Sequence, residues 1–189
     1  MMSTTMVERE IKLQFACAED ARAAVLAAGC TPLLGRRLQE DALLDTEDEL
    51  LRRRRCVLRV RVENGKSRVT FKGPVQPSAM KVREEQETLV GDGGVLLRVF
   101  EELGLHVWFR YEKYREEFSH EDVIVAIDET PVGVFVEIEG GEQGIAAMAA
   151  ALGRGATDHI VDSYRSLFLQ RREEFGLTGP DMLFDSCGP

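Results

Sequence analysis

The chain has 189 residues, which fits one domain with a hydrophobic core of its own. Hydrophobic residues make up 44% and charged residues 30% of the chain, a balance typical of a folded globular protein and not of a disordered one. The formal net charge of −9 argues against a general nucleic-acid binder or a protein that docks on anionic membranes, so we expect neither partner. A local basic pocket for a phosphate ligand is compatible with this charge.

Cysteine usage and hydropathy predict a cytoplasmic protein. The four cysteines, Cys17, Cys30, Cys56 and Cys187, are scattered and form no CxxC pair, so we interpret them as reduced thiols and expect no zinc site. No apolar run approaches the roughly 18 residues that a membrane-spanning helix needs. Residues 1–6 lack the apolar core of a signal peptide.

The first predicted element is a strand over residues 7–15, whose side chains alternate between a charged and an apolar face. The charged face presents Glu8, Glu10 and Lys12. Seven further strands are predicted, over residues 33–46, 56–63, 67–72, 81–90, 107–118, 123–128 and 132–139. Asn64-Gly65, between two of these strands, is the strongest short signal for a hairpin.

Helices are predicted between the strands and near the end of the chain. Their ranges are 19–28, 94–103, 142–152 and 158–175, and Asp92 is expected to cap the second of them. Four consecutive arginines, Arg52–Arg55, are interpreted as a solvated turn or a short helix. Residues 1–175 are assigned to a single tunnel domain, and residues 176–189 are predicted to form a flexible C-terminal tail.

Most of the strands are joined by hairpin-length links, so we expect a largely antiparallel sheet. Helices can cover its apolar faces, while its charged faces need water. Such a sheet can close on itself, and an eight-stranded barrel has an interior of the right size for one small ligand. We therefore predict an α+β fold, an eight-stranded and mostly antiparallel closed β-barrel, or tunnel, with a charged lumen and flanking helices. Periodicity alone also fits an open sheet with one solvated face.

In a closed barrel the charged faces all point into the lumen. The carboxylates on these faces are Glu8, Glu10, Glu85, Glu87, Asp128, Glu137 and Glu139. The cations are Lys12, Arg59, Arg61, Lys72, Arg83, Lys113 and Arg115. Paired carboxylates suit hard cations such as Mg²⁺ or Mn²⁺, and arginine and lysine suit phosphate oxygens. Because so many charges are costly to bury dry, the pattern indicates a wet site for a polyphosphate with a divalent metal.

Other patterns that could carry chemistry are weaker. The three histidines, His106, His120 and His159, have no ligand-like spacing. Ser163-Tyr164 is interpreted as a packing feature and not as a nucleophile. The sequence contains no Ser-His-Asp set, no phosphate-binding loop of the GxxxxGK type and no dinucleotide fingerprint.

A series of short motifs follows one order along residues 7–170. The motifs are Glu8-Arg9-Glu10-Ile11-Lys12, Asp41-x-x-x-Asp45-Thr46, Leu58-Arg59-Val60-Arg61, Phe71-Lys72-Gly73-Pro74, Arg83-Glu84-Glu85-Gln86-Glu87, Lys113-Tyr114-Arg115, Asp128, Gly133–Gly140 and Ser163-Tyr164. This ordered set resembles the CYTH proteins, also called triphosphate tunnel metalloenzymes, which include class IV adenylate cyclases, thiamine triphosphatases and inorganic triphosphatases. The chain departs from the family at Leu43-Leu44, where members often carry an aromatic pair.

The resemblance implies an eight-stranded tunnel and a reaction on a triphosphate that depends on Mg²⁺ or Mn²⁺. It implies that the metal ligands are Glu8, Glu10, Glu137 and Glu139, with Glu85 and Asp128 as further partners. It assigns the phosphate-binding residues as Lys12, Arg59, Arg61, Lys72, Arg83, Lys113 and Arg115. Glu8, Glu10 and Lys12 are the candidate catalytic residues, because activation of the nucleophile can rest on the metal or on Lys12.

Three functions fit these residues. The first is a triphosphatase, in which activated water attacks a terminal phosphorus of tripolyphosphate, ATP or thiamine triphosphate. The second is a class IV adenylate cyclase, which converts ATP to cyclic AMP and pyrophosphate. The third is a non-catalytic binder of polyphosphate or nucleotide, which the many carboxylates disfavour. No adenine-reading motif is evident, so hydrolysis is preferred. The sequence also allows a homodimer.

Overall fold

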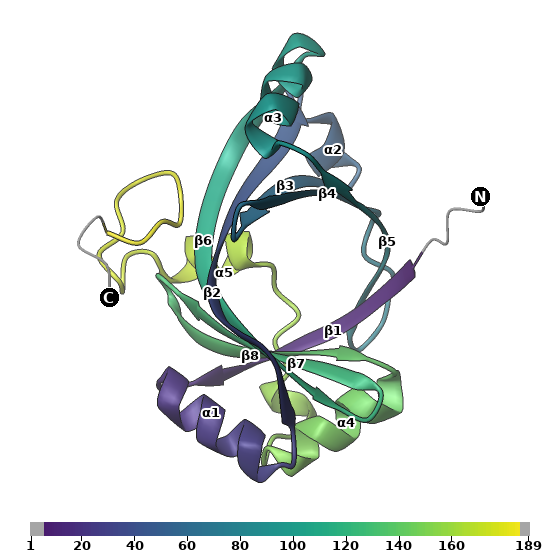
Figure 1. Cartoon of the computed structure of the whole chain (residues 1–189), viewed down its shortest axis with the longest axis vertical. Coiled ribbons are helices and arrows are strands. Elements are labelled where there is room, and N and C mark those ends of the chain that lie inside the picture. Colours follow the sequence, from purple (N-terminus) through teal and green to yellow (C-terminus); the bar gives the residue numbers. More distant parts are fainter. Residues whose placement is uncertain (1–5, 186–189) are drawn as a thin grey trace.

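Alternating charged and apolar side chains give each strand a wet and a dry face, and the structure closes these strands into a barrel. The computed structural model describes residues 6–185. Eight strands of this part of the chain close in the order β1–β5–β4–β3–β2–β6–β7–β8, with antiparallel neighbours throughout (Figure 1). The predicted fold class, an α+β antiparallel closed barrel flanked by helices, is confirmed.

The elements follow the predicted order. The strands are β1 (Met6–Phe15), β2 (Thr31–Thr46), β3 (Val57–Glu63), β4 (Lys66–Lys72), β5 (Lys81–Val90), β6 (Leu105–His120), β7 (Val123–Thr130) and β8 (Gly133–Gly140). The helices are α1 (Ala18–Ala27), α2 (Leu50–Arg53), α3 (Gly93–Glu102), α4 (Glu142–Ala151) and α5 (Tyr164–Arg171), with a 3₁₀ turn at Ala156–Asp158. None of the helices within residues 6–185 is long and apolar enough to cross a membrane.

One predicted turn and one predicted helix cap are present in the structure. Asn64 and Gly65 both adopt positive φ angles, 49° and 72°, which is the conformation of the tight turn that joins β3 to β4. Asp92 caps α3, because its carboxylate accepts a hydrogen bond of 2.9 Å from the backbone N–H of Val95. The tight turn sets the register between β3 and β4.

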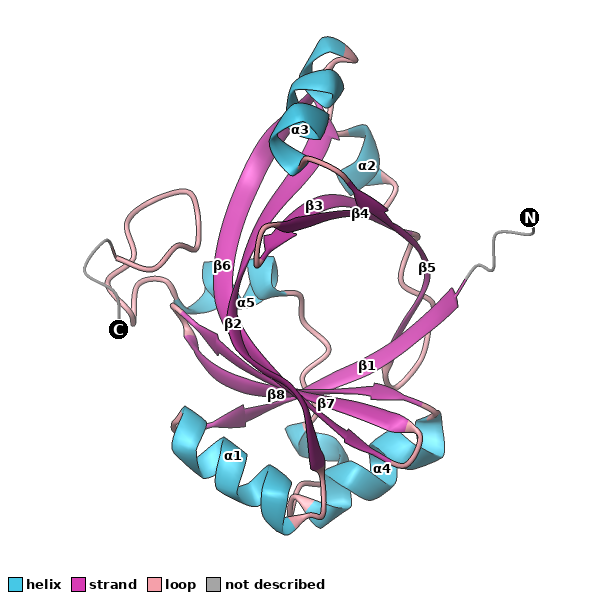
Figure 2. Ribbon diagram, in the orientation of Figure 1, coloured by secondary structure: helices cyan, strands magenta, loops and turns pink. Residues whose placement is uncertain are grey.

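The largest apolar core lies outside the barrel. Ile11 and Leu13 of β1 are fully buried, and they pack with apolar residues of β7, β8, α1 and α4. Figure 2 shows α1 and α4 lying side by side against the outer surface of these strands. Because the apolar faces are covered from outside, the charged faces are left to line the lumen.

The predicted helix over residues 158–175 is wrong at both ends, because the helix observed there, α5, spans only Tyr164–Arg171. Residues 159–163 are extended, because the backbone of Ile160 pairs with that of Lys12 through two hydrogen bonds of 2.9 Å. Helix α5 begins only at Tyr164, where the Ser163 hydroxyl caps it. The tertiary pairing with β1 therefore overrides the local helical pattern.

The C-terminal segment continues the barrel wall at one point. Met182 is fully buried and exchanges backbone hydrogen bonds with Arg110 (3.0 Å) and Glu112 (2.9 Å) of β6. The Phe184 ring lies 5.2 Å from the Tyr114 ring. These contacts occur within the segment that the sequence predicts to be a flexible tail, and the domain boundary itself stays a prediction.

The cysteines are placed in three different environments. Cys17 caps α1, Cys30 belongs to the outer core, and Cys56 is buried beside the lumen. All three are free thiols. Cys187 lies outside the described residues.

Candidate active site in the barrel lumen

The lumen contains a cavity of about 850 Å³. The charged side chains that line it include all but one of those that the sequence predicts for the lumen, and they come from six strands. They are Glu8, Glu10, Lys12, Arg59, Arg61, Lys72, Arg83, Glu85, Glu87, Lys113, Arg115, Glu137 and Glu139. Of the predicted lumen residues, Asp128 is the exception, because it is fully buried behind the wall. The structure thus brings the predicted residues together, and their roles stay predictions.

One arc of the barrel carries most of the carboxylates. Because β1 pairs with β8, Glu10 lies opposite Glu139 and Lys12 lies opposite Glu137. Five of the carboxylates that β1, β5 and β8 direct into the cavity form what we call the acidic wall, and they are Glu8, Glu10, Glu85, Glu137 and Glu139. Such a concentration of oxygen ligands suits a hard divalent cation.

The remaining arcs carry the cations. Five cationic side chains that β3, β4 and β6 direct into the cavity form what we call the basic wall, and they are Arg59, Arg61, Lys72, Lys113 and Arg115. Lys72 joins the two walls, since its Nζ lies 2.5 Å from Glu8 Oε1 and 2.9 Å from Glu85 Oε2. An anionic ligand between the walls would contact both cations and carboxylate-bound metal.

Lys12 lies within the acidic wall and is held charged. Its Nζ lies 2.9 Å from Glu10 Oε1 and 3.1 Å from Glu137 Oε2. Burial lowers the pKa of Lys12, but the two carboxylates outweigh burial and leave this pKa above its usual range. A lysine that stays protonated at neutral pH can stabilise negative charge but cannot accept a proton from water.

Two buried aspartates orient the basic wall from behind. Asp41 accepts two hydrogen bonds from Arg61, of 2.8 and 3.0 Å. Asp128 accepts two from Arg115, both of 2.6 Å, and one of 2.7 Å from Lys113. The sequence offered Asp41 only as part of a motif, and it did not indicate that this residue fixes an arginine of the lumen.

Tyr164 and Lys81 are further lumen residues whose positions the sequence did not reveal. The Tyr164 hydroxyl donates to Asp128, and its ring centroid lies 5.1 Å from Lys12 Nζ and 4.7 Å from Lys113 Nζ. Lys81 Nζ donates to Glu10 Oε1 at 2.5 Å. Tyr164 packs in the second apolar core, as the sequence suggests, but it also supports both lysines.

The acidic wall fits a divalent cation, although no three Asp, Glu, His or Cys side chains within residues 6–185 already converge on one point. Glu8 Oε2 is buried without a hydrogen-bond partner among these residues. Burial and the neighbouring Glu8 and Glu137 charges raise the pKa of Glu139 to about 7. A bound cation would give the Glu8 Oε2 atom a partner and would add positive charge beside Glu139.

Arg83 indicates where an anion would bind. Its Nε is buried and has no acceptor among the described residues. Burial lowers the pKa of Arg83 below its usual range, and the neighbouring Glu8 and Glu10 carboxylates offset this only in part. A phosphate oxygen beside Arg83 would satisfy the unpaired donor.

A family model described as the CYTH domain matches residues 6–160. This chain belongs to the CYTH family. The predicted resemblance is therefore confirmed. A curated relative, named as a putative adenylate cyclase of Methanocaldococcus jannaschii, is 33% identical over 105 residues, which are 55% of this chain and 60% of the relative. The match thus spans less than two thirds of that relative's length.

Solved structures share the tunnel fold. The PH1012 protein of Pyrococcus horikoshii OT3 superposes with a TM-score of 0.73 at 25% identity, over 85% of this chain and 98% of the other. A putative adenylyl cyclase of Hippeastrum, described as having a dominant triphosphatase activity, gives a TM-score of 0.63 at 18% identity, over 87% and 95% of the two chains.

Proposed function

We propose that this chain is a divalent-metal-dependent triphosphatase that binds its substrate in the barrel lumen. The observation that carries the proposal is the cavity between the acidic and the basic wall, where a buried carboxylate oxygen of Glu8 and a buried guanidinium nitrogen of Arg83 both lack partners among residues 6–185. A site that presents unpaired groups of both signs fits a ligand made of metal and polyphosphate together.

The basic wall would bind the phosphate chain. Arg61 and Arg115 are held in fixed orientations by Asp41 and Asp128, so each presents its remaining N–H groups to the cavity. Preorganised guanidinium groups of this kind bind phosphate oxygens without a large loss of side-chain entropy. Lys113 lies on the same arc of the barrel, where burial and the neighbouring Arg115 lower its pKa to about 7, so a phosphate bound beside it would favour its charged form.

The acidic wall would hold the metal through Glu8, Glu10, Glu137 and Glu139. Bound Mg²⁺ or Mn²⁺ would neutralise phosphate charge and lower the pKa of water at the site. Lys12 stays protonated between Glu10 and Glu137, so we assign it to charge stabilisation and not to proton abstraction. Enclosure by the barrel limits access of bulk water and strengthens these interactions.

Adenylate cyclase is the second candidate, because a relative 33% identical over 105 residues carries that name. The same walls would serve both reactions. They differ in whether water attacks a terminal phosphorus or the ribose 3′-hydroxyl attacks the α-phosphorus. The products therefore decide between them.

The test is phosphorus NMR of the purified chain with Mg²⁺ or Mn²⁺ and either tripolyphosphate or ATP. We expect orthophosphate from tripolyphosphate. The double variant Glu8→Gln, Glu10→Gln should lose this activity, because it removes two oxygens of the acidic wall. The matched control is Glu84→Gln, since Glu84 is exposed on β5 next to Glu85 and faces away from the cavity.

The product pattern also reveals the other two functions. Pyrophosphate with cyclic AMP from ATP, and no orthophosphate from tripolyphosphate, would replace the triphosphatase with the cyclase. Ligand binding without any product would replace it with a non-catalytic binder. Equal loss of activity in the Glu84→Gln control would show that the acidic wall has no special role.

A further inference from the structure

Lys81 enters the lumen from the first position of β5, and the strand register brings it onto the acidic wall. In the ladder between β1 and β5, Lys81 lies opposite Glu10, and Arg83 lies opposite Glu8. Residues that face each other across an antiparallel pair have Cβ atoms about 4.5–5.5 Å apart. The Lys81 ammonium therefore reaches the Glu10 carboxylate directly, and its Nζ lies 2.5 Å from Glu10 Oε1.

Two carboxylates of the acidic wall already have cationic partners from this chain. Glu10 Oε1 accepts from Lys81 and also from Lys12, at 2.9 Å. Glu137 has both oxygens in ion pairs, Oε2 with Lys12 at 3.1 Å and Oε1 with Arg115 at 2.8 Å. We call Glu10 and Glu137 the compensated pair.

Two other carboxylates of the same wall are less well compensated, and we call Glu8 and Glu139 the open pair. Glu8 Oε1 pairs with Lys72, but Glu8 Oε2 is buried without a hydrogen-bond partner among residues 6–185. Burial and the charges of Glu8 and Glu137 raise the pKa of Glu139 to about 7. By contrast, three neighbouring lysines outweigh burial at Glu10 and hold its pKa below the usual value. The open pair thus offers a place for one cation.

A second divalent ion would have to lie on the compensated pair. Two-metal sites hold their ions about 3.5–4 Å apart. Glu10 is the carboxylate nearest in register to the open pair, since it is two residues from Glu8 along β1 and opposite Glu139 of β8. An ion on Glu10 Oε1 would lie against the ammonium groups of Lys12 and Lys81, and like charges repel most strongly where burial excludes water.

Lys81 is the cation that completes the compensation of Glu10. Lys12 divides its charge between Glu10 and Glu137, whereas Lys81 forms an ion pair with Glu10 alone among residues 6–185. Burial and Lys12 lower the pKa of Lys81, and Glu10 opposes this shift. Without Lys81, Glu10 would keep only a share of one ammonium and would be free to bind a metal ion.

We propose that Lys81 is a positioning residue that takes the place of a second metal ion on Glu10, so that the acidic wall binds one divalent cation. This inference rests on the proposed binding of metal in the lumen. Glu8 and Glu139 would then be the main ligands of that cation, and Glu10, whose Oε1 is occupied, would add only Oε2. The Lys81 ammonium would supply a positive charge beside the metal.

The test counts the Mn²⁺ ions that the full chain binds, by electron paramagnetic resonance of the free and bound ion. The wild type should bind one Mn²⁺ per chain, and Lys81→Met and Lys81→Gln should each bind two. Two ions about 3.5–4 Å apart broaden each other's spectrum, so a second ion beside the first can be told from one elsewhere. Lys81→Arg keeps the charge and should still bind one.

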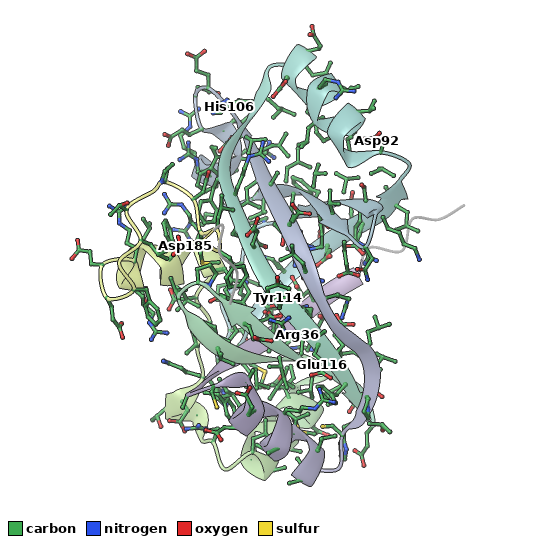
Figure 3. The ribbon with its side chains drawn as sticks, turned by 60° about the vertical axis from the view of Figure 1, so that its left-hand side comes forward. Arg36, Asp92, His106, Tyr114, Glu116 and Asp185 are labelled. Carbon is green, nitrogen blue, oxygen red and sulfur yellow. The ribbon has the colours of Figure 1, made fainter. Side chains whose placement is uncertain are left out.

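The matched control removes a cation from a carboxylate outside the lumen. Glu116 lies on the outer surface of β6, where Figure 3 labels it, and it pairs with Arg22 of α1. Arg22→Met uncovers Glu116 as Lys81→Met uncovers Glu10, and it should leave the count at one Mn²⁺. A second ion in Arg22→Met would show that any uncovered carboxylate binds Mn²⁺, and it would overturn the role of Lys81.

Other outcomes would also overturn the inference while leaving the proposed function intact. They are two coupled Mn²⁺ ions in the wild type, two in Lys81→Arg, or only one in both Lys81→Met and Lys81→Gln when these variants unfold at the wild-type Tm. Failure of the wild type to bind any Mn²⁺ would instead overturn the metal dependence of the proposed function, and this inference with it.

Discussion

Among the predicted site residues, Asp128 has hydrogen-bond partners that indicate its role most clearly. Its Oδ1 accepts from Arg115 Nε, and its Oδ2 accepts from Lys113, from Arg115 Nη2 and from Tyr164. Its side chain is fully buried and does not line the cavity. The sequence predicts Asp128 as a metal ligand, whereas its four hydrogen bonds favour a role in positioning the basic wall.

Replacing Asp128 separates these two roles. Asp128→Asn removes the charge that orients Lys113 and Arg115, so we expect kcat/KM for tripolyphosphate to fall by about 10–100-fold. The Mg²⁺ concentration for half-maximal activity should stay the same. In Glu139→Gln, which alters the acidic wall, that concentration should rise. Steady-state kinetics over a Mg²⁺ series measure both quantities. A higher Mg²⁺ requirement in Asp128→Asn would make Asp128 a metal ligand after all.

Among the elements, the short turn around α2 depends on one buried carboxylate. Burial raises the pKa of Asp45, but hydrogen bonds from Leu51, Arg52 and Thr46 outweigh burial and hold this pKa below its usual value. As pH falls, the unfolded chain therefore takes up the proton before the folded chain does. The stability that ionised Asp45 contributes is complete above about pH 5 and is lost as pH falls toward the folded-state pKa.

Asp45→Asn should thus destabilise the fold at pH 7 and matter less in acid. We expect the free energy of unfolding to drop by about 1–3 kcal/mol at pH 7, because the hydrogen bonds lose their charged acceptor. The difference from the wild type should shrink between pH 5 and pH 3. Urea denaturation across this pH range measures it. Glu47→Gln is the control, since Glu47 is an exposed carboxylate of the same turn. A pH-independent difference for Asp45→Asn would contradict the assigned pKa.

At the scale of elements, the sequence predicted the features that follow from alternating side chains along a strand. It missed the features that depend on a single tertiary contact. The period of two in residues 7–15 placed Glu8, Glu10 and Lys12 correctly in the lumen, because a strand allows only two faces. Nothing local announces a bulge of β6 at Trp108, which depends on pairing with β2. Residues 159–163 likewise look helical, and only the pairing of Ile160 with Lys12 makes them extended.

Across the whole molecule, charge is distributed unevenly. The chain carries a net charge of −9, yet the side chains that line its cavity include 13 arginines and lysines against nine carboxylates. The exterior is therefore more acidic than the average, so it repels polyanions at nonspecific positions. An anion that binds this protein tightly is directed to the lumen. Binding there should stabilise the fold, because the lumen is formed only when all strands of the barrel are paired.

Thermal unfolding tests this coupling between ligand and barrel. Tripolyphosphate with Mg²⁺ at 100 times its Kd should add about 2.7 kcal/mol of stability. For a domain of 150–250 residues this corresponds to a rise in Tm of about 5–11 °C.

Orthophosphate at the same ionic strength should give a much smaller rise, because one phosphate cannot span both walls. Removing Mg²⁺ with a chelator should reduce the effect of tripolyphosphate, since the acidic wall would then face the anion without a cation between them. Equal shifts with both anions would mean that screening of charge, and not occupation of the lumen, stabilises the barrel.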